Sequence, residues 1–411
     1  MLHSHLVRSL LAIYGVAALA VFPAAGTAAS QPAAAVGPPV PVCPRGGPPG
    51  TARCHLALAG DSRSYSITAP DPSALDPATV RAVYNFPSPP LPVPVFGSSN
   101  LPGSGQTIAI VDAYDDPPAE ADLGVFSSQY GLPACSSSNG CFTKVNQSGG
   151  GGYPTTNGAW ALEVSLDVQW AHAIAPGARI LLVEATSSSL VDLLAAEDYA
   201  KTHAAYVSNS WGTSEFGVEQ QYDGHFSQSN VSFFVSSGDS GLPAEWPSAS
   251  PNVISVGGTT LTANATGGTL LDSSGLFTGA ETGWSNGGGG CSRYERATGA
   301  QSTFQQYRQV KCGVKRATPD VSLDADPNSG LSVYDSTPYN GQSGWYKVGG
   351  TSAGAPMWAA RSAVAGRVVD ATFVYGSSMT YRDITSGNNG APCLVGYDLC
   401  SGRGSWTGVT P

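Results

Sequence analysis

Two acidic residues, Glu163 and Asp167, stand four positions apart in the apolar run AWALEVSLDVQW, residues 159–170. On a helix, side chains four residues apart share one face, so the two carboxyl groups would lie together. Neighbouring carboxyl groups in apolar surroundings repel when both are ionised, and the pKa of one must therefore rise. Such a pair could act as a general base in acid. Two solvated acids on a surface helix are the alternative, although the surrounding residues are too apolar for an exposed face.

A serine, Ser352, stands between small residues in the segment GGTSAGAP, residues 349–356, at the start of an expected helix. Small neighbours allow a substrate backbone to come close, and a helix N-terminus favours developing negative charge. These are the requirements of a nucleophilic serine in acyl transfer. A serine that caps a helix behind a glycine-rich turn fits the local pattern as well.

A nucleophilic serine needs a base, which is usually a histidine. The chain has six histidines, but none of them lies in a His-Gly-x-His motif. We expect His172, on the same helix as Glu163, to be structural. The sequence therefore favours Glu163 as the base of Ser352, with Asp167 orienting it as the third member of a triad.

A third acidic residue, Asp239, lies in the segment SSGDSG, residues 236–241, directly after an expected strand. A protonated aspartic acid can donate a hydrogen bond to a developing oxyanion, which an ionised one cannot do. This function would again require acid. A turn in which Asp239 caps a backbone amide is the alternative.

Repeated strand–helix units must position these residues. The expected strands are 107–113, 179–185, 205–212, 231–237 and 252–261, and the expected helices are 76–84, 159–173, 189–202, 215–229 and one that begins at 352. Continuous apolar strands followed by helices indicate an α/β fold with a doubly wound, mostly parallel sheet and helices on both faces. Ligands bind beyond the carboxyl ends of such strands, where Asp112, Ser208–Ser210 and Asp239 lie. The segment Ser208–Gly212 could line a substrate-binding strand edge or simply end a core strand.

The 411-residue chain carries few charges, with 19 Lys plus Arg against 29 Asp plus Glu and a net charge of -10. The acidic balance argues against nucleic acid as a partner. A charged content of only 12%, beside 41% hydrophobic residues, excludes a disordered or coiled-coil chain. Because few folded-state ion pairs can be lost in acid, the composition also predicts tolerance of acid.

The N-terminus is typical of an exported chain. Residues 1–29 combine a basic residue, a short apolar run and small residues before a cut, which are the parts of a signal peptide. The apolar run is shorter than the roughly 20 residues that a membrane span requires. We expect residues 30–71 to form a short Pro/Ala/Gly-rich prosegment or linker, mobile over 31–53, and residues 72–411 to form one large domain. The expected location is extracellular.

Eight cysteines in an exported chain are typical of disulfides. Their spacing favours four pairs that each close a short loop: Cys43–Cys54, Cys135–Cys141, Cys291–Cys312 and Cys393–Cys400. A metal cluster is disfavoured because the sequence contains no Cys-x-x-Cys pair.

Five separated blocks, AWALEVSLD, SNSWG, SSGDSG, ATPDVSLDADP and GGTSAGAP, occur in this order between residues 159 and 356. Together they resemble the sedolisin family of serine-carboxyl peptidases, over about residues 72–411. The resemblance implies a subtilisin-like fold and peptide-bond cleavage at low pH. It also implies the roles of four residues: Ser352 as nucleophile, Glu163 as general base and then acid, Asp167 as the group that orients Glu163, and Asp239 as oxyanion stabiliser.

The same resemblance implies one structural calcium ion near the C-terminus. Asp383 and Asp398 would supply carboxylates, and Ile384 and Gly396 would supply backbone carbonyls. These are the hard oxygen ligands that Ca²⁺ takes. Leu394 stands where the family often has a glycine. Cys393 and Cys400 flank the second segment, and a disulfide between them would stiffen the site.

The sequence thus predicts a secreted, acid-acting endopeptidase that hydrolyses protein or peptide substrates through an acyl-enzyme on Ser352. We expect no nucleic-acid partner, no membrane contact after signal removal, and a monomer. One departure concerns the prosegment, since the family carries a large folded one and this chain has about forty residues before the resemblance begins. Two alternatives remain: a catalytically silent, secreted sedolisin-like protein that binds peptides, and a subtilisin-type protease with a histidine base.

Overall fold

A ten-stranded sheet forms the centre of the computed structural model, which describes residues 37–44, 47–60, 65–66, 68–264, 268–376 and 379–408. In spatial order the sheet contains β19 (Tyr381–Arg382), β20 (Ser405–Trp406), β16 (Val321–Asp324), β12 (Ile254–Thr262), β10 (Ser232–Ser236), β8 (Tyr206–Asn209), β5 (Thr107–Ala113), β7 (Arg179–Ala185) and β6 (Phe142–Asn146), with β13 (Ala280–Gly283) beside β12. Neighbours from β20 to β6 pair in parallel, and only β13 and β19 pair antiparallel. The expected signal peptide, residues 1–29, lies outside the described residues.

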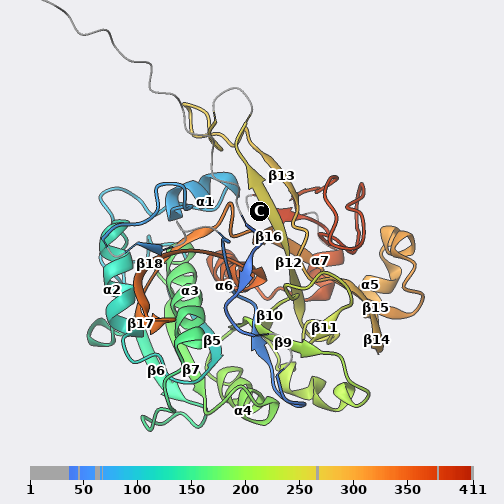
Figure 1. Cartoon of the computed structure of the whole chain (residues 1–411), viewed down its shortest axis with the longest axis horizontal. Helices are drawn as coiled ribbons and strands as arrows, with labels where there is room; N and C mark the ends of the chain where they lie inside the picture. Colours follow the sequence, from blue (N-terminus) through green and yellow to red (C-terminus); the bar gives the residue numbers. More distant parts are fainter. Residues whose placement is uncertain are drawn as a thin grey trace, which may run out of the picture. The chain divides into compact units, whose positions relative to one another are not determined.

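Helices α3 (Gly158–Ile174), α4 (Leu190–Ala200) and α6 (Gly354–Ala365) pack against this sheet (Figure 1). The other helices are α1 (Pro77–Val83), α2 (Ala119–Gln129), α5 (Gly299–Thr303) and α7 (Ala371–Gly376), together with the 3-10 turns η1 (Ser137–Asn139), η2 (Glu219–Phe226), η3 (Gln305–Val310) and η4 (Thr351–Ala353). Every residue of β5 after the first is buried. Since successive side chains of a strand point to opposite faces, both faces of β5 are covered. The predicted α/β fold with a mostly parallel sheet is confirmed.

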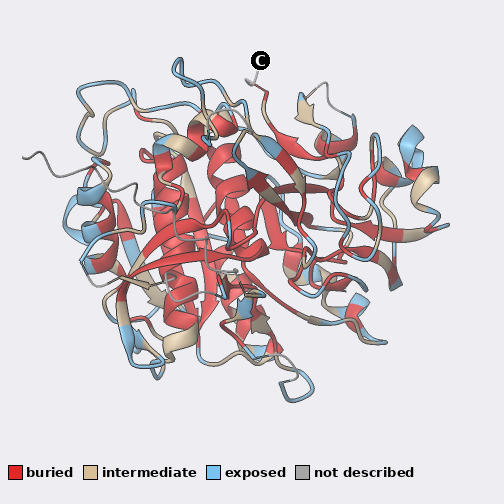
Figure 2. Ribbon diagram, turned by 45° about the horizontal axis from the view of Figure 1, so that its top comes forward, coloured by how far each residue is buried: buried red, intermediate tan, exposed pale blue. Residues whose placement is uncertain are grey.

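Smaller sheets flank the main one. A five-stranded sheet contains β1 (Val40–Pro41), β3 (Ala57–Leu58), β18 (Gln342–Gly349) and β17 (Leu331–Tyr339), with β4 (Tyr65–Ser66) also paired to β18. A three-stranded sheet contains β11 (Glu245–Trp246), β9 (Trp211–Ser214) and β2 (Arg53–Cys54), and a two-stranded antiparallel sheet contains β14 (Gly290–Arg296) and β15 (Lys315–Thr318). Buried residues fill the central helices and strands, whereas exposed residues concentrate in the peripheral loops (Figure 2).

Several sequence expectations differ from the structure. The segment 31–53, expected to be mobile, contributes β1 and the first residue of β2, and Val42 and Cys43 within it are buried. Two-residue strands in a Pro-rich stretch have no periodicity that would identify them. The helix expected over 215–229 is replaced by η2. There the Glu219 side chain accepts a hydrogen bond from the Phe216 amide.

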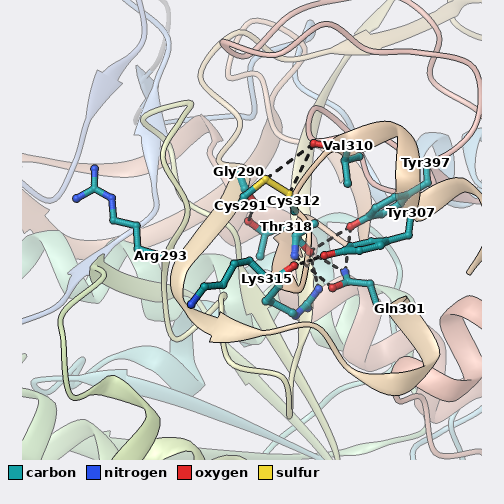
Figure 3. Close-up of a disulfide and its surroundings, with 12 residues drawn as sticks. Gly290, Cys291, Arg293, Gln301, Tyr307, Val310, Cys312, Lys315, Thr318 and Tyr397 are labelled. Atoms are coloured by element: carbon teal, nitrogen blue, oxygen red, sulfur yellow. Dashed lines mark hydrogen bonds between the residues drawn. A yellow bond between two sulfur atoms is a disulfide. The ribbon is translucent and has the colours of Figure 1, made fainter. Parts of the chain in front are cut away.

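The four predicted disulfides are all present: Cys43–Cys54, Cys135–Cys141, Cys291–Cys312 and Cys393–Cys400. The third joins β14 to the chain just before β15 (Figure 3). Beside it, Gln301 Nε2 and the Tyr397 hydroxyl donate to the Ala317 carbonyl at 2.8 and 3.1 Å. These contacts fix the position of β15, which comes just before β16 in the chain.

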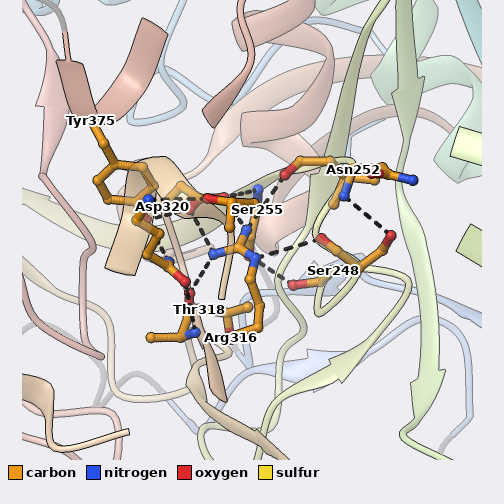
Figure 4. Close-up of polar contacts among 12 residues, drawn as sticks. Ser248, Asn252, Ser255, Arg316, Thr318, Asp320 and Tyr375 are labelled. Atoms are coloured by element: carbon orange, nitrogen blue, oxygen red, sulfur yellow. Dashed lines mark hydrogen bonds and ion pairs between the residues drawn. The ribbon is translucent and has the colours of Figure 1, made fainter. Parts of the chain in front are cut away.

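A buried ion pair fixes the start of that block. The guanidinium of Arg316 contacts the carboxylate of Asp320, which also accepts hydrogen bonds from the Ser255 amide at 2.7 Å and from the Tyr375 hydroxyl (Figure 4). Asp320 therefore ties the loop before β16 to β12. This contact sets the register of two central strands whose carboxyl ends lie at the candidate site.

Candidate active site

Helix α3 carries Glu163 and Asp167 through the interior of the protein. The Asn157 side chain caps the helix by accepting from the Ala159 and Trp160 amides at 3.0 and 3.3 Å. Every residue from Trp160 to Ile174 is buried, because α3 lies between the main sheet, α6 and β17. Both carboxyl groups, which lie one helical turn apart, are consequently removed from water.

Ser352 follows the end of β18, in η4. The preceding Gly350 has φ of 105°, and a Cβ atom there would lie 2.0 Å from the His55 carbonyl oxygen, so only glycine fits this turn. The sequence predicted a helix that begins at Ser352, and the structure has one 3-10 turn before α6. Because η4 and α6 pack against α3, the buried Ser352 lies beside Glu163.

The electrostatics of this group are dominated by burial. Burial raises the pKa of Glu163 well above its usual value, the charges of Asp167 and Asp112 raise it further, and contact with the Ser352 hydroxyl lowers it. The pKa of Asp167 is also raised well above its usual value by burial and by Asp112, while the Ser210 hydroxyl lowers it. Carboxyl groups packed in this way hold protons that isolated carboxylates would lose.

Asp112 is a member of this cluster that the sequence analysis placed only at a strand end. It lies near the carboxyl end of β5, fully buried, and burial raises its pKa to about 8. Its two neighbours come from a helix 50 residues further along the chain. Its position at a strand end pointed towards the site, but only the packing of α3 on β5 shows the contact.

Asp239 stands on the other side of the nucleophile candidate, in the loop after β10. Its Oδ1 accepts hydrogen bonds from the amide and the hydroxyl of Thr351, both at 2.8 Å. Burial raises the pKa of Asp239, and the His55 side chain opposes this rise. A Cβ atom on Gly350 would lie 2.7 Å from Asp239 Oδ2 and 2.0 Å from the His55 oxygen. The carboxyl group and the His55 carbonyl therefore approach the same point.

A segment of the chain itself lies across this site. β2 pairs antiparallel with β9, with Arg53 opposite Gly212 and Cys54 opposite Trp211. The next residue, His55, donates its amide to the Ser210 carbonyl at 3.1 Å and accepts from the Ser352 amide at 3.2 Å. This is how an added strand binds a sheet edge. The sequence analysis missed the segment because it is far from the site in sequence.

The space beside this segment is open. A cavity of about 720 Å³ lies along residues 47–53, between them, the start of α3 and β9. Trp160, Tyr114 and Phe216 are among its lining residues.

The described histidines are not placed to act as the base of Ser352 instead of the carboxyl groups. His172 is fully buried on α3, where its Nε2 contacts the Pro133 carbonyl at 2.9 Å and burial lowers its pKa to about 4. Among the described residues, no histidine side chain makes a hydrogen bond to the Ser352 hydroxyl, which donates to the Ser210 carbonyl at 3.3 Å. The local geometry thus favours a carboxyl base over a histidine base.

The residues expected to hold calcium meet around one loop. The Asp398 carboxylate accepts from the Leu394 and Ser401 amides at 2.6 and 2.7 Å, and Asp383 Oδ2 accepts from the Gly396 amide at 2.9 Å. The buried Ile384 side chain clusters with the Cys393–Cys400 disulfide. Two carboxylates and neighbouring backbone carbonyls match the oxygen donors that Ca²⁺ takes, so these residues fit the ion.

The fold and this arrangement of side chains agree with sequence comparison. The family model of the subtilase family matches residues 149–383, more than half of the chain. The chain therefore belongs to the subtilase family, whose members are serine-type peptidases. Membership of this family agrees with the serine-type peptidase predicted from the sequence.

Individual relatives show which peptidases this chain is most usefully compared with. Kumamolisin from Bacillus sp. (strain MN-32) is 29% identical over 400 residues, 85% of this chain and 64% of that protein. Xanthomonalisin from Xanthomonas sp. (strain T-22) is 28% identical over 384 residues, 76% of this chain and 44% of that protein. A Pseudomonas sedolisin structure, a serine-carboxyl proteinase complexed with two molecules of pseudo-iodotyrostatin, is 25% identical with a TM-score of 0.64 and covers 81% of this chain and 95% of that chain. The resemblance to the sedolisin family is confirmed.

The chain spans less than two thirds of the length of both curated relatives. Within the described residues, no helix combines the length and the apolar composition needed to cross a membrane.

Proposed function

We propose that this protein is a serine-carboxyl endopeptidase that acts on protein or peptide substrates in acid. The observation that carries this proposal is the burial of Ser352 beside Glu163 and Asp167, with Asp239 on the far side of the serine. Three separated blocks of sequence supply these four groups, and a purely structural serine would need none of the buried carboxyl groups.

In the proposed mechanism, Ser352 Oγ attacks the substrate carbonyl carbon while Glu163 takes the hydroxyl proton. Asp167, one turn along α3, orients Glu163. The Ser352 amide and a protonated Asp239 stabilise the oxyanion. Glu163 then returns the proton to the leaving amine, and water hydrolyses the acyl-enzyme with Glu163 again serving as base.

This chemistry requires acid. Glu163 must be ionised to accept a proton while the remaining carboxyl groups of the cluster stay protonated. Burial raises the pKa of Glu163, Asp167 and Asp239, and neighbouring carboxylates raise the pKa of Glu163 and Asp167 further, so this cluster retains protons that isolated carboxyl groups would lose. Above the pH at which all of them ionise, repulsion and the loss of the Asp239 donor would stop turnover.

Hydrolysis of a denatured protein at about pH 4 tests the proposal. Ser352→Ala is expected to abolish hydrolysis, and Glu163→Gln to lower kcat by about 10²–10⁴-fold because the base is lost. Far-ultraviolet circular dichroism of each variant controls for folding. Equal activity of wild type and Ser352→Ala would contradict the proposal, and a rate maximum near pH 8 would favour a histidine base.

We also propose one structural Ca²⁺ ion, held by the carboxylates of Asp383 and Asp398 and the carbonyls of Ile384 and Gly396. When bound, the ion would neutralise two carboxylates and join the segment after β19 to the loop closed by Cys393 and Cys400. The ion takes no part in the chemistry at Ser352.

Export is the final part of the proposal. The composition of residues 1–29 supports a signal peptide, and four disulfides fit an oxidising compartment. We assign residues 30–71 to a short prosegment, since part of it lies over the candidate site. A secreted protein that begins near residue 30 would support the signal peptide, and a processed form that begins near residue 72 would support the prosegment.

A further inference from the structure

Three buried carboxyl groups, those of Asp116, Asp122 and Asp335, lie together outside the candidate active site. One carboxyl oxygen from each residue lies within 4.8 Å of one from each of the other two. The residues come from three parts of the chain, which are the loop after β5, helix α2 and strand β17. Helix α2 packs against β17 (Figure 1), and the loop that carries Asp116 connects β5 to α2. Tertiary packing therefore brings these acids to one point.

Hydrogen bonds fix each of these carboxyl groups through one of its two oxygens. The Thr337 hydroxyl donates to Asp116 Oδ1 and the Thr337 amide donates to Asp335 Oδ1, both at 2.8 Å. The amide and the hydroxyl of Ser336 donate to Asp122 Oδ2 at 2.7 and 3.0 Å. Two consecutive residues of β17 thus orient all three carboxyl groups, in the way that outer partners orient the ligands of a metal ion.

Two further oxygens of this cluster are buried without a partner. Asp116 and Asp335 have no exposed surface. Within the described part of the chain, Asp116 Oδ2 and Asp335 Oδ2 have no hydrogen-bond partner. They are the second oxygens of the two carboxyl groups that Thr337 holds. Because a buried carboxylate oxygen without a donor is costly in free energy, a proton or a cation must compensate it.

Basic side chains do not supply that positive charge. Among the described residues, none of the three carboxyl groups forms an ion pair. The nearby Lys144 has its Nζ 2.6 Å from Asp115 Oδ1 and 3.5 Å from Glu184 Oε1. It contacts Asp116 through the backbone carbonyl, to which it donates at 3.0 Å. The charge of Lys144 is therefore matched by two carboxylates outside the cluster.

The donor set of the cluster matches a hard divalent cation. Ca²⁺ binds carboxylate oxygens at about 2.3–2.6 Å, so two oxygens on one ion lie at most about 5 Å apart. The carboxyl oxygens of this cluster satisfy that limit. Mg²⁺ gives up its water reluctantly and is usually bound through one or two carboxylates. Three carboxyl groups in a buried position therefore favour Ca²⁺ over Mg²⁺.

We propose that Asp116, Asp122 and Asp335 bind one Ca²⁺ ion, at a site separate from the proposed C-terminal calcium site. The ion takes the place of the protons that the cluster holds without it, and it joins the loop after β5 and helix α2 to β17. Since β17 pairs with β18, which leads into η4, the ion braces the strand pair that carries the nucleophile candidate. This inference does not depend on the proposed function.

Calcium titration of the full chain tests this inference. The parent protein carries Ser352→Ala, which prevents self-digestion, and Asp398→Asn, which removes the C-terminal site. After treatment with a chelator and dialysis, isothermal titration calorimetry with Ca²⁺ alone counts the bound ions. The titration is made at about pH 8, where fewer protons compete for the carboxyl oxygens than in acid. We expect one ion per chain. A parent protein that is folded by circular dichroism and binds no Ca²⁺ would overturn the inference.

Single substitutions in the parent protein then locate the ion. Asp335→Asn and Asp116→Asn keep the shape of each side chain and remove its charge. Each should weaken Ca²⁺ binding by at least about a hundredfold, since even the outer partners of metal ligands contribute about 10–100-fold. The matched control is Glu197→Gln, which changes a fully buried acid on α4 and should bind Ca²⁺ as the parent does. Unchanged binding in either folded aspartate variant, or an equal loss in the control, would contradict the proposed site.

Discussion

The acidic residues of the candidate site differ from the catalytic histidine of a histidine-based serine peptidase in one physical respect. Their charge states depend on exclusion from water, because Glu163, Asp167 and Asp112 are all fully buried. Imidazole would be uncharged in this surrounding at neutral pH, whereas a carboxyl group buried beside others keeps a proton until the solution is well above its normal pKa. A weak base such as a carboxylate can therefore serve only where its neighbours remain protonated.

Asp239 offers a residue-scale prediction. Asp239→Asn should move the alkaline limit of kcat/KM to higher pH without abolishing activity, because an amide donates a hydrogen bond at any pH whereas Asp239 donates only while it is protonated, up to a pKa that burial raises. Asp239→Ala, which has no donor, should lower kcat by about 10²–10³-fold. The measurement is the pH–rate profile of both variants on one peptide. An alkaline limit that stays where the wild type has it would contradict the oxyanion role.

Elements, rather than neighbouring residues, bring the site together. Helix α3 supplies the two acids, β18 and η4 supply the serine, and β10 ends at the loop of Asp239. The glycine at 350 allows the turn between β18 and η4 to pass against the His55 carbonyl. The C-terminal loop is a separate element, closed by Cys393–Cys400 and organised around the Asp398 carboxylate.

Calcium binding to this loop gives an element-scale prediction. Burial raises the pKa of Asp398 to about 6, and a bound cation would favour its ionised form. Addition of Ca²⁺ at a hundred times its dissociation constant should stabilise the folded state by about 2.7 kcal/mol, and a chelator should reverse this. Thermal unfolding measures this stabilisation. Mg²⁺ is the comparison ion, and it should stabilise the protein less because it demands a tighter geometry than Ca²⁺. Asp398→Asn should remove the contribution of this loop. An unfolding temperature that ignores Ca²⁺ in the wild type would exclude the site.

At the scale of the whole molecule, the chain has few charged residues, and many of its acidic side chains are buried. Burial raises the pKa of Asp116 to about 7, of Glu197 to about 8, and of Glu184 and Asp335 to about 9. Asp116, Asp122 and Asp335 have carboxyl oxygens within 4.8 Å of one another. The folded-state pKa values of all these buried acids lie above the values of about 4 that the same groups have in the unfolded chain.

These shifts predict that the fold is more stable in acid than in mild alkali. A carboxyl group whose pKa is raised by folding contributes its full stabilisation below its unfolded pKa, and the contribution is lost as the pH rises through the folded value. The free energy of unfolding in urea with a chelator should therefore fall between about pH 5 and pH 9. Asp335→Asn should flatten this dependence, since it removes one group that titrates near the upper limit. Stability that rises steadily over the same range would contradict the prediction.

Much of the fold could be predicted from local pattern. The strands 107–113 and 179–185 match β5 and β7 in the structure, and Asp76 caps α1 by accepting from the Thr79 amide, as its position before Pro77 indicates. The strand expected over 205–212 is divided at Ser210 into β8 and β9, which join different sheets. This division depends on the pairing of β9 with β2 and β11. Both partners are too far away in the sequence for a local pattern to reveal the pairing.

The sequence by itself determined the residue types, the helical spacing and the order of the five blocks. From these properties it predicted Ser352, Glu163, Asp167 and Asp239 as the groups that carry the chemistry. Only the tertiary structure decided that Asp112 joins these acids and that His55 lies beside Ser352. The physical reason is that burial and strand pairing arise between segments far apart in the chain. A two-residue strand in a Pro-rich stretch has no periodicity of its own, and it is identified only by the edge it pairs with.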